Sequence, residues 1–209
     1  MKILAVSDQV IDRLYSTTVK QAYPDVEMVI GCGDLPYAYL EFLLSVLNVP
    51  TLYVPGNHDP LYKPNVEGFY VGGAINLDRE VMYSKGLLFA GLGGSVFYPP
   101  GSANQYSQSS MFMRVYQLLP KIFMAQRKYN RPLDILITHS PPAGVHDDDD
   151  PTHRGLHALN LLLRWVKPRF MLHGHTMFYR QNLQSHITRY YSTDVMNVYP
   201  FRVFDVDKG

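Results

Sequence analysis

The 209-residue chain has only one cysteine and no long uninterrupted apolar stretch. With Cys32 alone, no disulfide can form within the chain, and a reducing compartment is the default expectation. No window approaches roughly 18 unbroken apolar residues, so we expect no membrane span. The first residues run straight into a strand-like segment, without the apolar core and small-residue cleavage site of a signal peptide. We therefore expect a cytoplasmic protein.

The chain also lacks an excess of charge of either sign. Its 19 Lys and Arg residues nearly balance its 18 Asp and Glu residues, which leaves a net charge of +1. This balance provides no broad basic face for duplex nucleic acid and no polybasic membrane anchor. A hydrophobic content of 46% is typical of a globular protein. The length predicts a single domain over residues 1–209 and leaves the oligomeric state open.

Strand-like and helix-like segments alternate through the first third of the chain. We expect strand, helix, strand, helix and strand over 2–7, 12–22, 26–31, 38–47 and 50–55. In the second of these helices, Leu40, Leu43, Leu44 and Leu47 form an apolar stripe with the 3.6-residue period that packs on a sheet. Such alternation implies parallel strands joined by right-handed crossovers.

The rest of the chain predicts a second sheet. A hairpin is expected over 81–91 around Lys85-Gly86, followed by a helix over 110–129 that is kinked or begun afresh at Pro120. A further alternating unit and a strand-rich tail follow, over 133–138, 154–166, 169–173, 187–192 and 195–206. Two sheets face to face with helices outside accommodate all these segments.

Five polar motifs follow the ends of predicted strands. They are Ser7-Asp8-Gln9, Gly33-Asp34, Gly56-Asn57-His58-Asp59, Thr138-His139 and Gly174-His175-Thr176-Met177. In open α/β sheets, ligand sites lie at the carboxyl ends of the strands. The sequence therefore predicts that these five loops share one crevice.

The residue types in these motifs suit a divalent metal and proton transfer. An Asn57 oxygen and the imidazoles of His139 and His175 are candidate metal ligands. His58, held by a carboxylate such as Asp59, could donate a proton. Taken singly, Gly33-Asp34 is equally well explained by a turn. The alternative for Asn57 to Asp59 is an Asx-rich turn, which the other motifs outweigh.

In order and in strand placement, the motifs from Ser7 to Met177 resemble those of the calcineurin-like metallophosphoesterases. The family pattern is Asp-x-His, Gly-Asp, Gly-Asn-His-Asp/Glu, a strand-end His and Gly-His-x-His. The resemblance implies an α/β fold of the four-layer α/β/β/α sandwich type, with two mixed sheets flanked by helices. It also implies metal-dependent hydrolysis of phosphate esters, in which a metal-activated water attacks phosphorus.

The resemblance assigns a role to each matching residue. Asp34 would bridge two metals, and Asn57, His139 and His175 would complete the second metal. Asp8 would bind the first metal. His58, with Asp59, would protonate the leaving group.

Two positions depart from the pattern, and both concern the first metal. Val10 and Met177 stand where the family has histidines that bind this ion. We therefore expect one well-formed site and one impaired site. Two carboxylates without imidazoles suit Mn²⁺ or Mg²⁺. Mn²⁺ is the expected ion, with Mg²⁺, Zn²⁺ or Fe as the alternatives.

The loop 146–157 is rich in histidine and aspartate and has two interpretations. It is a solvated acidic loop, or one of its groups, such as His146 or His153, completes the first site. Arg154 and Arg180 are candidates for phosphate contact, although no motif supports either.

Two functions follow from these observations. The first is a metal-dependent phosphomonoesterase or phosphodiesterase acting on a small molecule rather than on duplex nucleic acid. The alternative is a weak or inactive member that serves as a binding or scaffold module, as a related sandwich in the retromer coat does.

Overall fold

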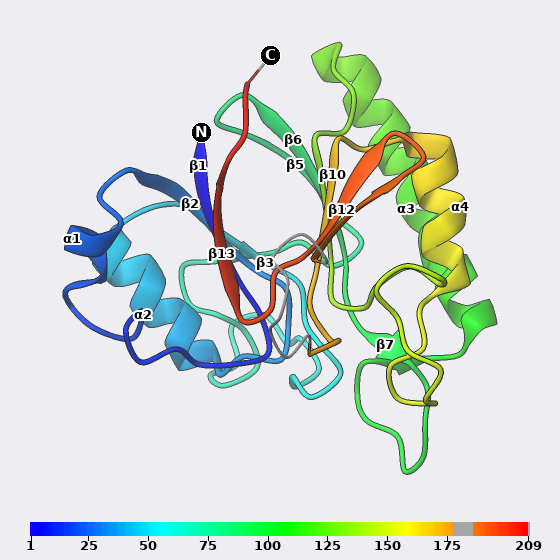
Figure 1. The fold of residues 1–209 in the computed structure, drawn as a ribbon, viewed down its shortest axis with the longest axis horizontal. Coiled ribbons are helices and arrows are strands. Elements are labelled where there is room, and N and C mark those ends of the chain that lie inside the picture. The colour runs from blue at the N-terminus through cyan, green and yellow to red at the C-terminus, as the bar shows by residue number, and fades with distance from the viewer. Residues whose placement is uncertain (178–185, 209) are drawn as a thin grey trace.

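The strands form two sheets that face each other in the middle of the molecule (Figure 1). The computed structural model describes residues 1–177 and 186–208. The first sheet has the order β13 (Phe201–Asp205), β1 (Lys2–Val6), β2 (Val26–Gly31), β3 (Thr51–Tyr53), β4 (Ile75–Asn76). The second has the order β11 (Ile187–Tyr190), β12 (Thr193–Asn197), β10 (Phe170–His173), β9 (Ile135–Thr138), β6 (Leu87–Leu92), β5 (Val81–Ser84).

Both sheets combine a parallel centre with antiparallel edge strands. Strands β1 to β4 are parallel, and β13 adds an antiparallel edge. In the second sheet β6, β9, β10 and β12 are parallel, with β5 and β11 as antiparallel edges. A short parallel pair, β7 (Ser95–Val96) and β8 (Gln105–Tyr106), lies apart from them. The parallel centres direct the carboxyl ends of several strands to one edge of each sheet.

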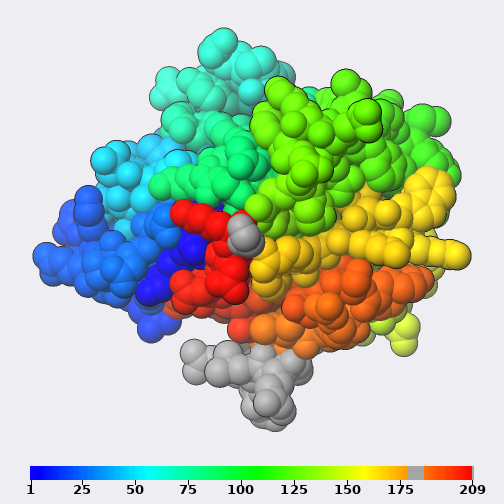
Figure 2. Space-filling model, turned by 90° about the horizontal axis from the view of Figure 1, so that it is seen from above, coloured from blue at the N-terminus to red at the C-terminus, as the bar shows by residue number. Residues whose placement is uncertain are grey.

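Helices cover the outer faces of both sheets. Helices α1 (Val19–Ala22) and α2 (Tyr37–Leu47) pack on the first sheet, and α3 (Gln108–Tyr129) and α4 (His157–Val166) pack on the second. Figure 2 shows the blue amino-terminal part and the yellow α4 region on opposite sides, with the red carboxyl-terminal strand between them. The chain is therefore a four-layer α/β/β/α sandwich, as the sequence predicts.

Strand periodicity divides the apolar core into three layers. In β9, Ile135 and Ile137 contact the layer between the two sheets, whereas Leu136 contacts the layer beneath α3 and α4. In β1, Ile3 faces the layer between the sheets and Leu4 faces α1 and α2. Because these strands are buried on both faces, they read as continuous apolar runs in the sequence.

Two helix predictions need correction, and for a third helix one of two predicted alternatives is excluded. Helix α1 covers only the end of the predicted span 12–22, because Ser16 and Thr18 side chains bond locally and favour turns over a helix. Helix α3 runs without a new start through Pro120, since its buried stripe packs on the sheet on both sides of the proline. Helix α4 begins at His157 rather than at residue 154.

The predicted hairpin is confirmed. The hairpin of β5 and β6 turns at Lys85 and Gly86, both of which have positive φ angles. No helix within 1–177 or 186–208 combines the length and the apolarity needed to span a bilayer. The single-domain organisation over 1–209 stays a prediction.

Candidate metal centre

The five predicted motifs lie where strands of the two sheets end. Asp8, Asp34 and Asn57 follow β1, β2 and β3 of the first sheet, and His139 and His175 follow β9 and β10 of the second. Short contacts connect these loops across the gap between the sheets: Asn57 Oδ1 lies 2.9 Å from His139 Nε2, and Asp8 accepts a hydrogen bond from the main-chain N–H of His175. The strand ends thus bring together side chains that are remote in sequence.

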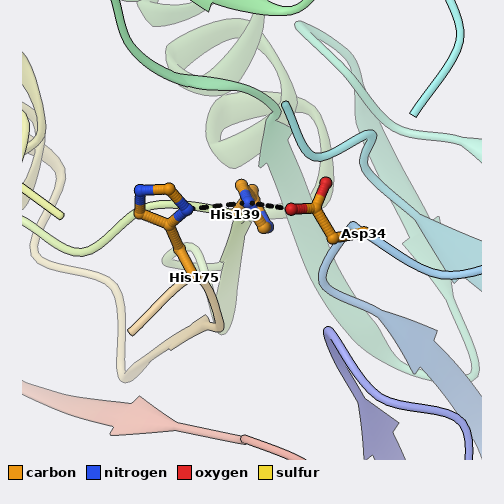
Figure 3. Close-up of side chains that lie close together, drawn as sticks. All are labelled: Asp34, His139 and His175. Carbon is orange, nitrogen blue, oxygen red and sulfur yellow. Dashed lines mark hydrogen bonds and ion pairs between the residues drawn. The ribbon is translucent and has the colours of Figure 1, made fainter. Parts of the chain in front are cut away.

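Three of these side chains form a tight cluster (Figure 3). His139 Nε2 lies 3.3 Å from Asp34 Oδ2 and 3.1 Å from His175 Nδ1. Asn57 Oδ1 lies 2.9 Å from the same His139 nitrogen. The ligand atoms of Asp34, His139 and His175 all lie within 4.8 Å of one another. Among the described residues, no other group of three or more His, Cys, Asp or Glu side chains is as close.

When both imidazoles are neutral, the cluster has fewer hydrogen-bond donors than acceptors. His139 Nδ1 lies 2.8 Å from the Cys32 carbonyl, which can only accept, so Nδ1 carries the hydrogen. By the same logic, His175 Nε2 donates to the Thr152 carbonyl at 2.8 Å and leaves Nδ1 with a lone pair. In their neutral forms, His139 Nε2, His175 Nδ1, Asn57 Oδ1 and Asp34 Oδ2 therefore direct lone pairs at one another.

A divalent cation fits this donor set. Metal bonds of about 2.1 Å to nitrogen and oxygen place neighbouring ligand atoms about 3.0–3.4 Å apart, which is the spacing found around His139 Nε2. Two imidazoles, one carboxylate and one amide oxygen are accepted by several first-row divalent metals. One cation satisfies all four lone pairs, whereas one proton satisfies at most two.

The electrostatics of the cluster also demand positive charge. Burial disfavours a charged His139, yet the charges of Asp34 and Asp8 and the hydrogen bond to Asp34 raise the pKa of this imidazole to about 10. Burial opposes ionisation of Asp34 as well, but His139 lowers the pKa of that carboxyl to about 2. Burial and the His139 charge lower the pKa of His175 to about 3, so it offers a neutral nitrogen.

Asp8 is brought to the crevice but has a different partner. Both of its carboxylate oxygens accept from the main-chain N–H of His175, at 3.0 and 3.2 Å. Burial raises the pKa of this carboxyl. Asp8 does not belong to the tight ligand group found among the described residues.

His58 and Asp59 diverge in the structure. The His58 side chain is 71% exposed, with Nε2 at 4.0 Å from Asp34 Oδ2. The Asp59 carboxylate is buried and accepts from the main-chain N–H groups of Gly56 at 2.7 Å and Asp34 at 2.9 Å. Burial raises the pKa of Asp59 to about 6. Within the described residues no hydrogen bond joins Asp59 to the His58 ring, so its observed role is to connect the two loops.

The backbone at the site is strained. Asp8, Asp34 and His175 have φ angles of 62°, 55° and 65°, in the left-handed region that non-glycine residues rarely adopt. Such strain concentrates at functional sites and persists only where the surrounding contacts hold it. A Cβ atom at Gly56 would collide with the Asp34 side chain, and one at Gly174 with Ser7 and Asp8. These glycines allow the loops to approach one another.

A loop between β7 and β8 holds the Asn57 turn, and no motif reveals it. Asn57 Nδ2 donates to the Tyr98 hydroxyl at 3.0 Å, and the Ser102 hydroxyl donates to the Asn57 carbonyl. Asn104, which is buried, donates to the carbonyls of Gly56 and Asp59 at 3.1 and 2.9 Å. These contacts span more than 40 residues of sequence, so no local pattern indicates them.

The acidic loop after β9 also reaches the site. Its Thr152 carbonyl accepts from His175, and His153 Nδ1 lies 2.6 Å from Asp150 Oδ2. Asp147 Oδ1 and Oδ2 accept from Gly144 N and Gly155 N, at 3.0 and 3.1 Å. A cavity of about 440 Å³ is lined by Asp8, Asp34, His58, Tyr98, Thr152, His153, His175 and Met177. The loop therefore forms one wall of the crevice.

The remaining histidines and arginines lie elsewhere or outside the described residues. His146 Nδ1 lies 2.9 Å from His173 Nε2 and its Nε2 lies 2.8 Å from Thr188, away from the ligand group. His157 and Arg154 are exposed. Arg180 falls outside the described residues.

Comparison with known proteins identifies the family. The pattern of the calcineurin-like phosphoesterase family matches residues 1–179. The chain belongs to this family. Membership places it in a superfamily of metal-dependent phosphoesterases and implies divalent-metal binding, in agreement with the ligand cluster.

Individual relatives are distant. An uncharacterised protein of Methanocaldococcus jannaschii is 24% identical over 190 residues, which cover 84% of this chain and 79% of the relative. A Thermus thermophilus protein of known structure aligns with a TM-score of 0.63 and 18% identity, covering 94% of this chain and 88% of that chain. Another solved structure aligns with a TM-score of 0.65 and 17% identity, covering 94% and 90%. At these identities the structural similarity establishes the fold alone.

Proposed function

We propose that this protein is a metal-dependent hydrolase of small-molecule phosphate esters with one well-formed cation site. Asp34, Asn57, His139 and His175 would hold the ion. The observation that supports this most is the convergence of Asn57 Oδ1, Asp34 Oδ2 and His175 Nδ1 on His139 Nε2, at 2.9, 3.3 and 3.1 Å. Mn²⁺ is the expected ion, with Mg²⁺, Zn²⁺ or Fe as the alternatives.

A divalent cation supplies a Lewis acid that polarises a phosphoryl oxygen and lowers the pKa of water. The protein's own groups hold the ligands in place for it. The Cys32 and Thr152 carbonyls fix the ring orientations of His139 and His175, as hydrogen-bond partners of metal-binding imidazoles commonly do. Burial of His139 and Asn57 keeps competing water away from these two donors.

His58 is the proposed general acid. Its ring is exposed and lines the cavity, where it can reach a leaving oxygen of a bound ester. Its main-chain N–H donates to Asp34 Oδ1 at 2.8 Å, which ties its position to the metal loop. General acid catalysis typically contributes about 10²–10⁴-fold to the rate. Asp59 is proposed to act by joining the Gly56 and Asp34 loops.

The substrate is proposed to be a phosphomonoester or phosphodiester of a small molecule. The cavity of about 440 Å³ has room for a phosphate ester with a modest leaving group. A near-neutral charge balance disfavours duplex nucleic acid. With one cysteine, a cytoplasmic location is the proposed one.

Metal analysis and turnover test this proposal together. The purified protein is incubated with Mn²⁺, and bound metal is measured alongside hydrolysis of p-nitrophenyl phosphate and bis(p-nitrophenyl) phosphate. We expect hydrolysis that needs Mn²⁺ and that falls in the His58→Gln variant without loss of bound metal. No hydrolysis of either ester by the wild type, or equal hydrolysis by His58→Gln, contradicts the proposal.

A second candidate function is a binding module without efficient turnover. It is favoured by Val10 and Met177 at the places of two family histidines and by the use of Asp8 to bind the His175 amide. Such a module would bind its partner equally well as wild type and as His58→Ala. An enzyme would lose turnover in that variant.

A further inference from the structure

The side chain of Tyr98 contacts the Asn57 amide, and the same residue lines the cavity. Tyr98 follows β7, and its hydroxyl is 3.0 Å from Asn57 Nδ2. An amide nitrogen can only donate, so the hydroxyl accepts this hydrogen bond and retains its own hydrogen. Tyr98 also lines the same cavity as Asp34, His58 and His175.

The contact has a consequence for the orientation of Asn57. A side-chain amide presents its oxygen on one side and its NH₂ group on the other. With Nδ2 bound to Tyr98, Oδ1 faces His139 Nε2 at 2.9 Å, which is the orientation a cation ligand needs. A reversed amide would direct NH₂ at the cluster and remove one of its four donors.

Tyr98 is held in place by the loop that carries it. Its main-chain N–H donates to Gln105 Oε1 at 3.4 Å, and the same oxygen accepts from Ser102 N at 3.2 Å. Ser102 and Asn104 in turn donate to main-chain carbonyls of the Asn57 turn. The loop that carries Tyr98 is therefore hydrogen-bonded to the turn that the Tyr98 hydroxyl contacts, and these bonds fix the position of the phenol.

The free hydrogen of the phenol has a use in this cavity. Asp8 and Asp34 line the cavity and repel an anionic ester. A neutral hydroxyl can donate to a phosphoryl oxygen without adding charge. Because the ordinary pKa of a tyrosine hydroxyl is about 10, the group keeps its hydrogen in neutral solution.

We propose that Tyr98 positions the Asn57 amide for the cation and donates its hydroxyl hydrogen to a phosphoryl oxygen of the substrate. The second role rests on the proposed function above, whereas the first does not. No covalent step is involved. The tyrosine supplies a donor in a cavity that Met177 also lines, at a position where the family pattern has an imidazole.

The positioning role is tested by the affinity for Mn²⁺. Calorimetric titration compares wild type, Tyr98→Phe and the control Tyr116→Phe, an exposed tyrosine on α3. Loss of a partner that orients a metal ligand typically costs about 10- to 100-fold in affinity, so we expect about a tenfold loss for Tyr98→Phe and none for the control. Equal affinity of wild type and Tyr98→Phe overturns the positioning role.

A double-mutant cycle separates orientation from a general structural defect. Asn57→Asp replaces the amide by a carboxylate whose two oxygens are equivalent, so no orientation remains to be selected. We expect Tyr98→Phe to weaken Mn²⁺ binding much less in this background than in wild type. An equal loss in both backgrounds means that Tyr98 supports the loop only, and contradicts the proposal.

The substrate contact is tested with inorganic phosphate and with turnover. With Mn²⁺ saturating, we expect Tyr98→Phe to bind inorganic phosphate several-fold more weakly and to lose about tenfold in kcat/KM, mainly in kcat. Unchanged phosphate binding and unchanged kcat overturn the donor role. If wild type hydrolyses neither nitrophenyl ester, the proposed function fails, while the Mn²⁺ and phosphate titrations still decide both roles of Tyr98.

Discussion

The crevice has two halves, one around His139 and one around Asp8, and they differ in how many potential metal ligands they contain. Around His139, four potential metal-ligand atoms converge, and two carbonyls fix the ring hydrogens of His139 and His175. On the other side, Asp8 binds a main-chain amide, Val10 packs against the apolar layer of α1 and α2, and Met177 is 46% exposed. The half around His139 contains a set of ligand atoms that one divalent cation could satisfy together, and the described residues on the Asp8 side form no such set. The proposed metal site therefore lies in the half that includes His139.

The first test of this difference removes the carboxylate of Asp34. Asp34→Asn keeps the shape of the side chain but removes the negative charge that draws positive charge into the site. We expect Mn²⁺ affinity to fall by more than about 100-fold and hydrolysis to be lost. Mn²⁺ titration measures this, with Asp148→Asn in the exposed part of the acidic loop as the matched control. If Asp34→Asn binds Mn²⁺ as tightly as wild type does, the metal does not bind in the half around His139.

The second test separates metal binding from proton transfer. His58→Gln should lower kcat by about 10²-fold or more because a proton donor is lost, while Mn²⁺ affinity stays near that of wild type. Single-turnover and steady-state rates measure this, and His157→Gln, an exposed histidine at the start of α4, serves as control. A matching fall in both variants would argue against a specific role for His58.

The comparison is sharpened by restoring the family histidines. Val10→His combined with Met177→His supplies two imidazoles near Asp8, and we expect a second equivalent of Mn²⁺ to bind and kcat to rise about tenfold. Metal analysis of the variant at saturating Mn²⁺ gives the stoichiometry. A count unchanged from wild type would show that the geometry around Asp8, and not the lack of imidazoles, limits that half.

Metal binding should depend on pH in a defined direction. The pKa of His139 is raised to about 10 in the metal-free site, so this ring is charged at pH 7 and must lose a proton to bind metal. We expect Mn²⁺ affinity to rise by about tenfold per pH unit between pH 6 and 8, with release of about one proton. Calorimetry in buffers of different ionisation enthalpy measures the release, and its absence would contradict the charge assigned to His139.

The smallest expected effect concerns Asp59. Asp59→Ala leaves the buried N–H of Gly56 and the partly buried N–H of Asp34 without an acceptor, and should lower the free energy of unfolding by about 1–3 kcal/mol. Asp59→Asn retains an accepting oxygen and should recover most of this loss. Denaturant unfolding of the metal-free protein gives both values. Equal stability of all three proteins would mean that the carboxylate does not hold the two loops together.

Much of the fold could be predicted because its signals are local. The positions of β1, β2, β9 and β10 follow from apolar runs, and the hairpin at Lys85-Gly86 follows from its turn residues. The helix expected at 12–22 was wrong because side-chain hydrogen bonds in the turn at Ser16 and Thr18 are not visible in apolar spacing. The start of α4 was misplaced because Gly155 binds Asp147, a contact made within the loop fold.

The sequence by itself determined which residue types stand at the strand ends, and hence that Asp34, Asn57, His139 and His175 should meet in a phosphoesterase-like crevice. Only the tertiary structure decided the partners of each group: Asp59 on the Asp34 amide, Asp8 on the His175 amide and Tyr98 on Asn57. Strand periodicity is a property of neighbouring residues and can be read along the chain. A hydrogen bond depends on distances of a few ångströms between segments that lie 25 to 167 residues apart, and these distances exist only once the sheets have packed.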